Sequence, residues 1–186
     1  MPSSDPQTIP KVLSLVMGLQ PKTILDVGAG NGRYGFLFRE CLDLNYGRLA
    51  KGMWQIEIDA LEVDYGYLNP VYDYVYTKII VENWMDYDIQ KRYNFIFMGD
   101  VLEHFVNWSD ALEKAKKYSD ITMIVSPNWP GSMAQGSWHG HDQEDHKIAL
   151  SPEKVGGRCV FANSKTFISV FDNNNTGIFD GKDFLL

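Results

Sequence analysis

The most informative segment of the sequence is Thr23-Ile24-Leu25-Asp26-Val27-Gly28-Ala29-Gly30-Asn31-Gly32-Arg33-Tyr34-Gly35. It starts as a short β-branched and apolar run, which predicts a buried strand. Four glycines within eight residues then interrupt the run, and apolar residues return at helical spacing over residues 36–42. Glycines let a backbone pass close to a ligand, and the start of a helix presents free N–H groups. The stretch therefore predicts a strand, a tight turn and a helix around a nucleotide-type pocket.

Two kinds of ligand fit this loop. Residues 30–35 satisfy the pattern G-x-G-x-x-G, which is typical of dinucleotide sites. Asp26 opposes that interpretation, because a carboxylate just before the turn would repel a pyrophosphate, whereas it suits a cation such as the ammonium group of an amino acid. The loop contains no lysine and no G-K-[ST], which argues against a Walker-type triphosphate site. A glycine-rich turn without a ligand is the remaining alternative.

Residues 24–32 resemble the first motif of the class I S-adenosylmethionine (SAM)-dependent methyltransferases. The resemblance covers roughly residues 21–171. It implies an α/β fold, namely a Rossmann-like three-layer sandwich with a mostly parallel seven-stranded sheet and an antiparallel C-terminal hairpin. The alternation of strand-type and helix-type segments favours the same class of fold. We expect residues 1–186 to form a single domain, with an N-terminal arm and helix over 1–20 and a substrate-side loop over 132–150.

The resemblance makes S-adenosyl-L-methionine the cofactor and assigns residues to its methionine and ribose parts. Asp26 would lie near the ammonium group. The loop residues that would hold the methionine and ribose are Gly28, Ala29, Gly30, Asn31 and Gly32. An acid after the second strand of such a sheet can hold ribose hydroxyls, and we assign this role to Glu62 in preference to Asp64. A solvated acid at the end of a strand is the alternative for Glu62.

A β-rich run over residues 74–81 predicts the third strand, and two candidate adenine contacts follow it. The family often places an acid or amide here for the adenine amino group, with an apolar neighbour against the ring. Asn83 and Trp84 match these roles in residue type. Trp84 fits a core position equally well.

The apolar run over residues 93–98 leads into Asp100-Val101-Leu102-Glu103-His104, and a Val-Leu-Glu-His run marks a recurrent subtype of the same family. The resemblance implies that Asp100 lies over the methionine end of the cofactor, with Glu103 and His104 facing the substrate or bracing the loop. An imidazole near neutral pKa can accept a proton, so His104 and the later His146 are the candidate catalytic residues. A hydrogen-bonded structural histidine is the alternative for His104.

Three of the four histidines lie within eight residues, between His139 and His146. In the methyltransferase subtype this segment is a variable loop that supplies substrate contacts. His139, His141, Asp145 and His146 also suggest a metal-dependent hydrolase, because imidazoles and carboxylates bind zinc readily. A solvated flexible loop is the third interpretation. We assign no metal site under the methyltransferase interpretation.

The composition limits the function further. The chain has 186 residues, a net charge of −7 and an apolar fraction of 45%. An acidic chain without a dense Lys/Arg run argues against a large nucleic-acid footprint and favours a small-molecule acceptor. We find no membrane-length segment and no signal-peptide pattern, and we expect a cytoplasmic protein. A cofactor-binding protein of this fold without transferase activity is a further alternative. The sequence specifies neither the acceptor nor the oligomeric state.

Overall fold

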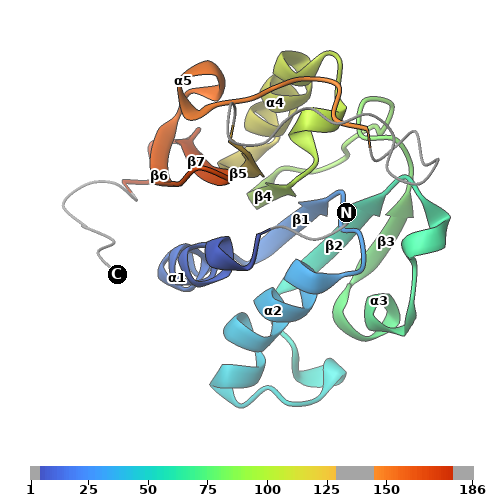
Figure 1. The fold of residues 1–186 in the computed structure, drawn as a ribbon. Coiled ribbons are helices and arrows are strands. Elements are labelled where there is room, and N and C mark those ends of the chain that lie inside the picture. Colours follow the sequence, from blue (N-terminus) through green and yellow to red (C-terminus); the bar gives the residue numbers. More distant parts are fainter. Residues whose placement is uncertain (1–4, 129–144, 178–186) are drawn as a thin grey trace.

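The computed structural model describes residues 5–128 and 145–177, and these residues form one seven-stranded sheet between two layers of helices (Figure 1). The strands are β1 (Thr23–Val27), β2 (Glu57–Glu62), β3 (Lys78–Val81), β4 (Tyr93–Gly99), β5 (Ser119–Pro127), β6 (Arg158–Ala162) and β7 (Thr166–Asp172). Their order is β3-β2-β1-β4-β5-β7-β6. The first five strands pair in parallel, whereas β7 is antiparallel to both β5 and β6. The predicted fold, including the C-terminal hairpin, is confirmed.

Helices cover both faces of the sheet. One face packs against α1 (Ile9–Leu19), α2 (Arg33–Leu42) and α3 (Pro70–Val75), and the other against α4 (Trp108–Lys117) and α5 (Pro152–Val155). Short 3₁₀ turns span Pro6–Thr8, Leu44–Tyr46, Lys51–Met53, Tyr65–Tyr67 and Leu102–His104. Within the described ranges, no helix is both long enough and apolar enough to cross a bilayer.

The side chains of β1 alternate between the two cores, as the pleat of a strand requires. Ile24 packs in the core beneath α1–α3, and Leu25 and Val27 pack in the core beneath α4 and α5. The same alternation turns Asp26 toward the face that α2 and α3 cover. The position of this acid in the strand therefore decides which helices can supply its partners.

The largest difference from the predicted elements lies before β3. The sequence pattern predicts a strand over residues 74–81, but β3 begins only at Lys78, because α3 continues to Val75. Pro70 occupies the first turn of α3, and the Asn69 side chain accepts a hydrogen bond from the backbone N–H of Val71 at 2.9 Å. The helix that begins at this cap continues through Tyr74 and Val75, although both residue types favour strands.

Candidate functional site

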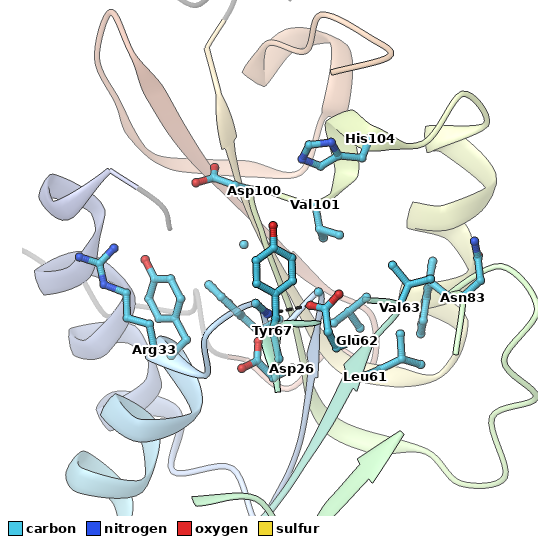
Figure 2. A pocket seen from close by; sticks show the side chains of 18 of the residues that line it. Asp26, Arg33, Leu61, Glu62, Val63, Tyr67, Asn83, Asp100, Val101 and His104 are labelled. Atoms are coloured by element: carbon cyan, nitrogen blue, oxygen red, sulfur yellow. Dashed lines mark hydrogen bonds between the residues drawn. The ribbon is translucent and has the colours of Figure 1, made fainter. Parts of the chain in front are cut away.

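A cavity opens at the carboxyl ends of β1, β2 and β4, where ligands bind in open α/β sheets (Figure 2). Nine of the twelve predicted site residues line it: Asp26, Gly28, Ala29, Gly30, Glu62, Asn83, Trp84, Asp100 and His104. Asn31 and Gly32 are not among the lining residues, and neither is His146. Gly32 instead occupies the position before the first residue of α2. The sequence prediction missed Arg33, Tyr34 and Tyr67, which also line the cavity.

The backbone N–H groups of the glycine loop are used within the protein. Those of Gly28 and Ala29 both point at the carbonyl oxygen of Leu61, at 2.8 and 3.3 Å. The N–H of Gly30 donates to Oε2 of Glu62 at 2.8 Å. A dinucleotide loop needs such donors for its pyrophosphate. Here a protein carboxylate already occupies that role, which argues against a phosphate ligand.

The structure leaves no room for a side chain at Gly28. Its φ is +66°, and a Cβ atom there would lie 2.6 Å from Cγ2 of Val101. Val101 belongs to the segment after β4, so the close approach brings two edges of the cavity together. A side chain at Gly28 would force them apart.

Asp26 lies at the base of the cavity and is only 2% exposed. Its Oδ2 accepts a hydrogen bond from the Tyr76 hydroxyl at 2.7 Å, and the Gly35 backbone amide also donates to its carboxylate. The pKa of Asp26 is raised to about 7, chiefly by burial and with a contribution from the nearby Glu62 carboxylate, although the two hydrogen bonds lower it. A bound cation would restore the ionised form.

Glu62, at the end of β2, is the second carboxylate of the cavity. It is 5% exposed, and its two oxygens accept from the backbone N–H groups of Asp64, at 3.0 Å, and Gly30. Burial raises the pKa of Glu62, although these backbone donors lower it. The Val63 backbone N–H is a third donor to this carboxylate, and the two oxygens together still keep a lone pair that can accept a ligand hydroxyl. Two buried acids at one loop favour a ligand with positive charge and hydroxyl groups.

Two tyrosines of the α3 region support the loop from below. The Tyr72 hydroxyl donates to the carbonyl oxygen of Gly30 at 2.6 Å, and the Tyr76 hydroxyl holds Asp26. Both rings are buried and lie 4.9 Å apart between centroids. Their spacing of four residues is a helical signal, but the strand prediction over 74–81 obscured it.

Asn83 and Trp84 reach the cavity from the segment after β3. The Trp84 ring is 1% exposed, and its Nε1 donates to the carbonyl oxygen of Ala111 at 3.1 Å. The Lys114 ammonium group lies 5.0 Å from the centre of this ring. Trp84 is therefore anchored in the core beneath α4 while it borders the cavity. Asn83 is exposed, and its Oδ1 accepts from the backbone N–H of Met85 at 2.8 Å.

Asp100 and His104 line the opposite wall of the cavity. Asp100 has a φ of 50°, in the left-handed region that non-glycine residues rarely adopt, and such strain is common at functional sites. His104 Nδ1 lies 3.0 Å from the carbonyl oxygen of Asp145, and its ring centre is 5.1 Å from that of His146. The structure thus brings the two predicted catalytic histidines together.

Two of the four residues of the predicted hydrolase cluster fall outside the described residues. His139 and His141 belong to the undescribed segment 129–144, as does most of the predicted loop 132–150. Asp145 and His146 are described, and they lie beside His104.

The strand order, the reversed β7 and the glycine loop after β1 define the class I methyltransferase fold. No family model and no curated protein matches the chain. Several solved structures are similar to this chain in fold. The N-terminal domain of EvdMO1, crystallised in the presence of SAH and D-fucose, has a TM-score of 0.64 and 12% identity over 91% of this chain and 84% of that one.

Two other solved structures give the same result. An O-methyltransferase family protein from Burkholderia thailandensis has a TM-score of 0.60 and 11% identity, over 88% of this chain and 55% of that one. The methyltransferase domain of bacterial CtHen1-C has a TM-score of 0.57 and 16% identity, over 89% of this chain and 96% of that one. At these identities the similarity establishes the fold.

Proposed function

We propose that this chain is a SAM-dependent methyltransferase that acts on a small-molecule acceptor. The observation that carries the proposal is the pair of buried carboxylates, Asp26 and Glu62, at a glycine loop whose N–H groups over residues 28–30 are already engaged. SAM carries an ammonium group, a sulfonium and ribose hydroxyls, and it has no phosphate. Several structures of the same fold contain SAH, the product of SAM.

The residues of the cavity fit the parts of this cofactor. Asp26 would bind the ammonium group and Glu62 the ribose hydroxyls, with the methionine part along Gly28–Gly30. Asn31 and Gly32 would complete the loop at the start of α2. Asn83 would meet the adenine edge and Trp84 would form the wall beside it.

Bound SAM supplies a methyl group on a positively charged sulfur, which is already activated for displacement. The protein therefore has to align the acceptor with that methyl group and exclude water. Asp100 borders the cavity on the side where His104 and His146 meet. We assign this side to the acceptor, with the two histidines as the catalytic residues.

The charge of the chain and the structural neighbours support the proposed class of acceptor. A net charge of −7 disfavours a polyanionic acceptor such as a nucleic acid. One neighbour was crystallised with SAH and the sugar D-fucose, and another belongs to an O-methyltransferase family. These support a hydroxylated small molecule.

Calorimetry tests the cofactor assignment. We expect stoichiometric binding of SAH to the whole chain and no binding of NAD⁺. Glu62→Gln keeps the size of the side chain but removes its charge, and it should lower the affinity for SAH at least tenfold. Glu113→Gln is the matched control, because this exposed glutamate pairs with Lys116 on the surface of α4. Binding of NAD⁺ in preference to SAH would contradict the proposal, and so would equal SAH affinity in the two variants.

A further inference from the structure

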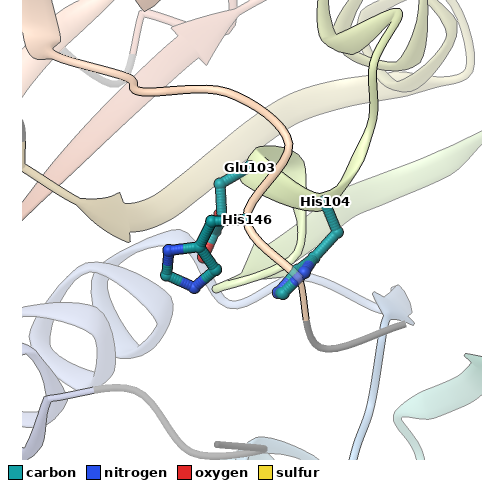
Figure 3. A group of neighbouring side chains, drawn as sticks. All are labelled: Glu103, His104 and His146. Carbon is teal, nitrogen blue, oxygen red and sulfur yellow. The ribbon is translucent and has the colours of Figure 1, made fainter. Parts of the chain in front are cut away.

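Glu103, His104 and His146 converge beside the cavity (Figure 3). Each offers one ligand atom, and these three atoms all lie within 4.8 Å of one another. Glu103 and His104 come from the 3₁₀ turn Leu102–His104, whereas His146 comes from a segment more than forty residues later. Two backbone hydrogen bonds fix this approach, because the N–H groups of Lys147 and Ile148 donate to the Glu103 carbonyl oxygen at 2.8 and 3.2 Å.

Glu103 carries an unsatisfied oxygen at this point. The residue is 1% exposed, and Oε2 accepts a hydrogen bond from the Ser126 hydroxyl at 3.0 Å. Oε1 is buried and has no hydrogen-bond partner among the described residues. A buried carboxylate oxygen without a partner is costly, whereas a bound cation would satisfy it. This oxygen is an observation independent of the two histidines.

The contact that His104 makes is also typical of a metal ligand. Its Nδ1 faces the carbonyl oxygen of Asp145, which can only accept, so the neutral ring carries its proton on Nδ1. The lone pair of the ring is then on Nε2. Metal-binding histidines commonly donate their second ring N–H to a backbone carbonyl, which fixes the tautomer and the ring orientation.

We propose that Glu103, His104 and His146 form a site for a divalent transition-metal ion. Two imidazoles and one carboxylate suit Zn²⁺ and its first-row neighbours better than Mg²⁺ or Ca²⁺, which prefer oxygen ligands. Three protein ligands leave coordination positions for water or a substrate. The metal alternative suggested by the sequence uses His139, His141, Asp145 and His146, and of these four residues only His146 belongs to the site proposed here.

The position of the site gives it a role in the proposed methyl transfer, and this role rests on the proposed function. His104 lines the cavity, so the metal would lie at the acceptor side. A metal there would bind the acceptor hydroxyl and lower its pKa, and the hydroxyl proton would leave to water. The oxygen then forms a bond to the methyl carbon while the C–S bond breaks and its electron pair stays on sulfur, which gives a methyl ether and SAH.

Metal titrations of the tag-free whole chain test the site without any need for an acceptor. We expect one Zn²⁺ per chain by calorimetry, and Co²⁺ should produce visible absorption bands with the same stoichiometry. Two variants, Glu103→Gln and His146→Ala, should each lower the affinity for the metal at least tenfold. Glu103→Gln keeps a group that can pair with Ser126. The double variant His139→Ala/His141→Ala is the control, and it should bind metal as the wild type does.

Absence of stoichiometric metal binding in the wild type would overturn the proposal, and so would a loss of binding only in the His139→Ala/His141→Ala control. SAH titration of each variant shows that it is folded and separates the two proposals. SAH binding without any metal site would contradict only the metal proposal. A metal site without SAH binding would contradict only the proposed function.

Discussion

The Tyr76 hydroxyl donates a 2.7 Å hydrogen bond to Oδ2 of Asp26, fifty positions earlier in the chain, and both side chains are almost completely buried. The bond connects the end of α3 to β1 directly beneath the glycine loop. It also stabilises the ionised form of Asp26 in a site where burial disfavours the charge. Under the proposed function, the affinity of the cavity for the ammonium group of SAM would therefore depend on Tyr76, which is not among the lining residues.

Tyr76→Phe should remove this support. We expect a further rise in the pKa of Asp26, a weaker affinity for SAH by several-fold near neutral pH, and a loss of about 1–2 kcal/mol in the free energy of unfolding. Calorimetry and urea denaturation measure the two effects. Tyr93→Phe is the matched control, because the Tyr93 hydroxyl makes the same kind of buried bond to Asp59, at 2.8 Å, away from the cavity. It should lose stability and keep its SAH affinity; an equal loss of affinity in both variants would contradict the account.

The raised pKa predicts that ligand binding depends on pH. With a pKa of about 7, Asp26 is largely protonated below neutral pH, and a protonated acid attracts an ammonium group poorly. The SAH affinity should therefore rise as the pH increases from about 6 to about 8. Calorimetry across this range measures the effect, and Asp26→Asn should have a lower affinity that no longer changes with pH. A wild-type affinity that is flat over the same range would exclude the assigned role of Asp26.

The raised pKa of Asp26 makes the stability of the protein fall with rising pH, whereas the affinity for SAH should increase. The pKa of Asp26 rises from 3.8 to about 7 on folding, so the folded protein holds this proton more tightly than the unfolded chain does. The resulting stabilisation is complete below pH 3.8 and is lost as the pH rises through about 7. Asp26→Asn removes the ionisation and should be roughly 1–4 kcal/mol more stable than the wild type at pH 8. Urea denaturation should show this difference shrinking as the pH falls toward 5, and a variant that is less stable at pH 8 would contradict the prediction.

Gly35 allows a steric test of the contact between Tyr76 and Asp26. A Cβ atom at this position would lie 2.3–2.4 Å from ring and hydroxyl atoms of Tyr76, a rigid and buried side chain. Gly35→Ala should cost about 1–3 kcal/mol of stability and lower the affinity for SAH, because the Tyr76 ring must move away from Asp26. Gly52→Ala is the control, since a Cβ there meets no atom within 4 Å. Thermal unfolding and SAH titration compare the two, and equal behaviour would show that the contact is unimportant.

The sequence predicts most of this fold because its signals are local. The helix over residues 9–19 ends where the apolar spacing ends, and the strand of Thr23–Val27 stops at the first glycine. The early part of the predicted strand over 74–81 was wrong, because the Asn69 cap and Pro70 start a helix that overrides the strand propensity of the tyrosines. Asn107 occupies the position before the first residue of α4, but its side chain makes no capping hydrogen bond.

The candidate site is less predictable, because its key contacts are long-range. Asp26 and Glu62 could be found because Glu62 ends β2, Asp26 is the second-last residue of β1, and parallel strands bring their carboxyl ends to one edge. The hydrogen bonds from Tyr72 and Tyr76 join residues 42 and 50 positions apart, and nothing in the local sequence indicates them. The meeting of Glu103 with His146 likewise depends on how the segment after residue 144 returns to the end of β4.

A crystal structure of the chain grown with saturating SAH would show directly whether this cavity binds the cofactor. We expect electron density for SAH in this cavity, with its ribose hydroxyls on the Glu62 carboxylate and its amino group toward Asp26. Density for SAH at another place on the protein would contradict it, and so would an empty cavity in crystals grown at a concentration that saturates binding in solution.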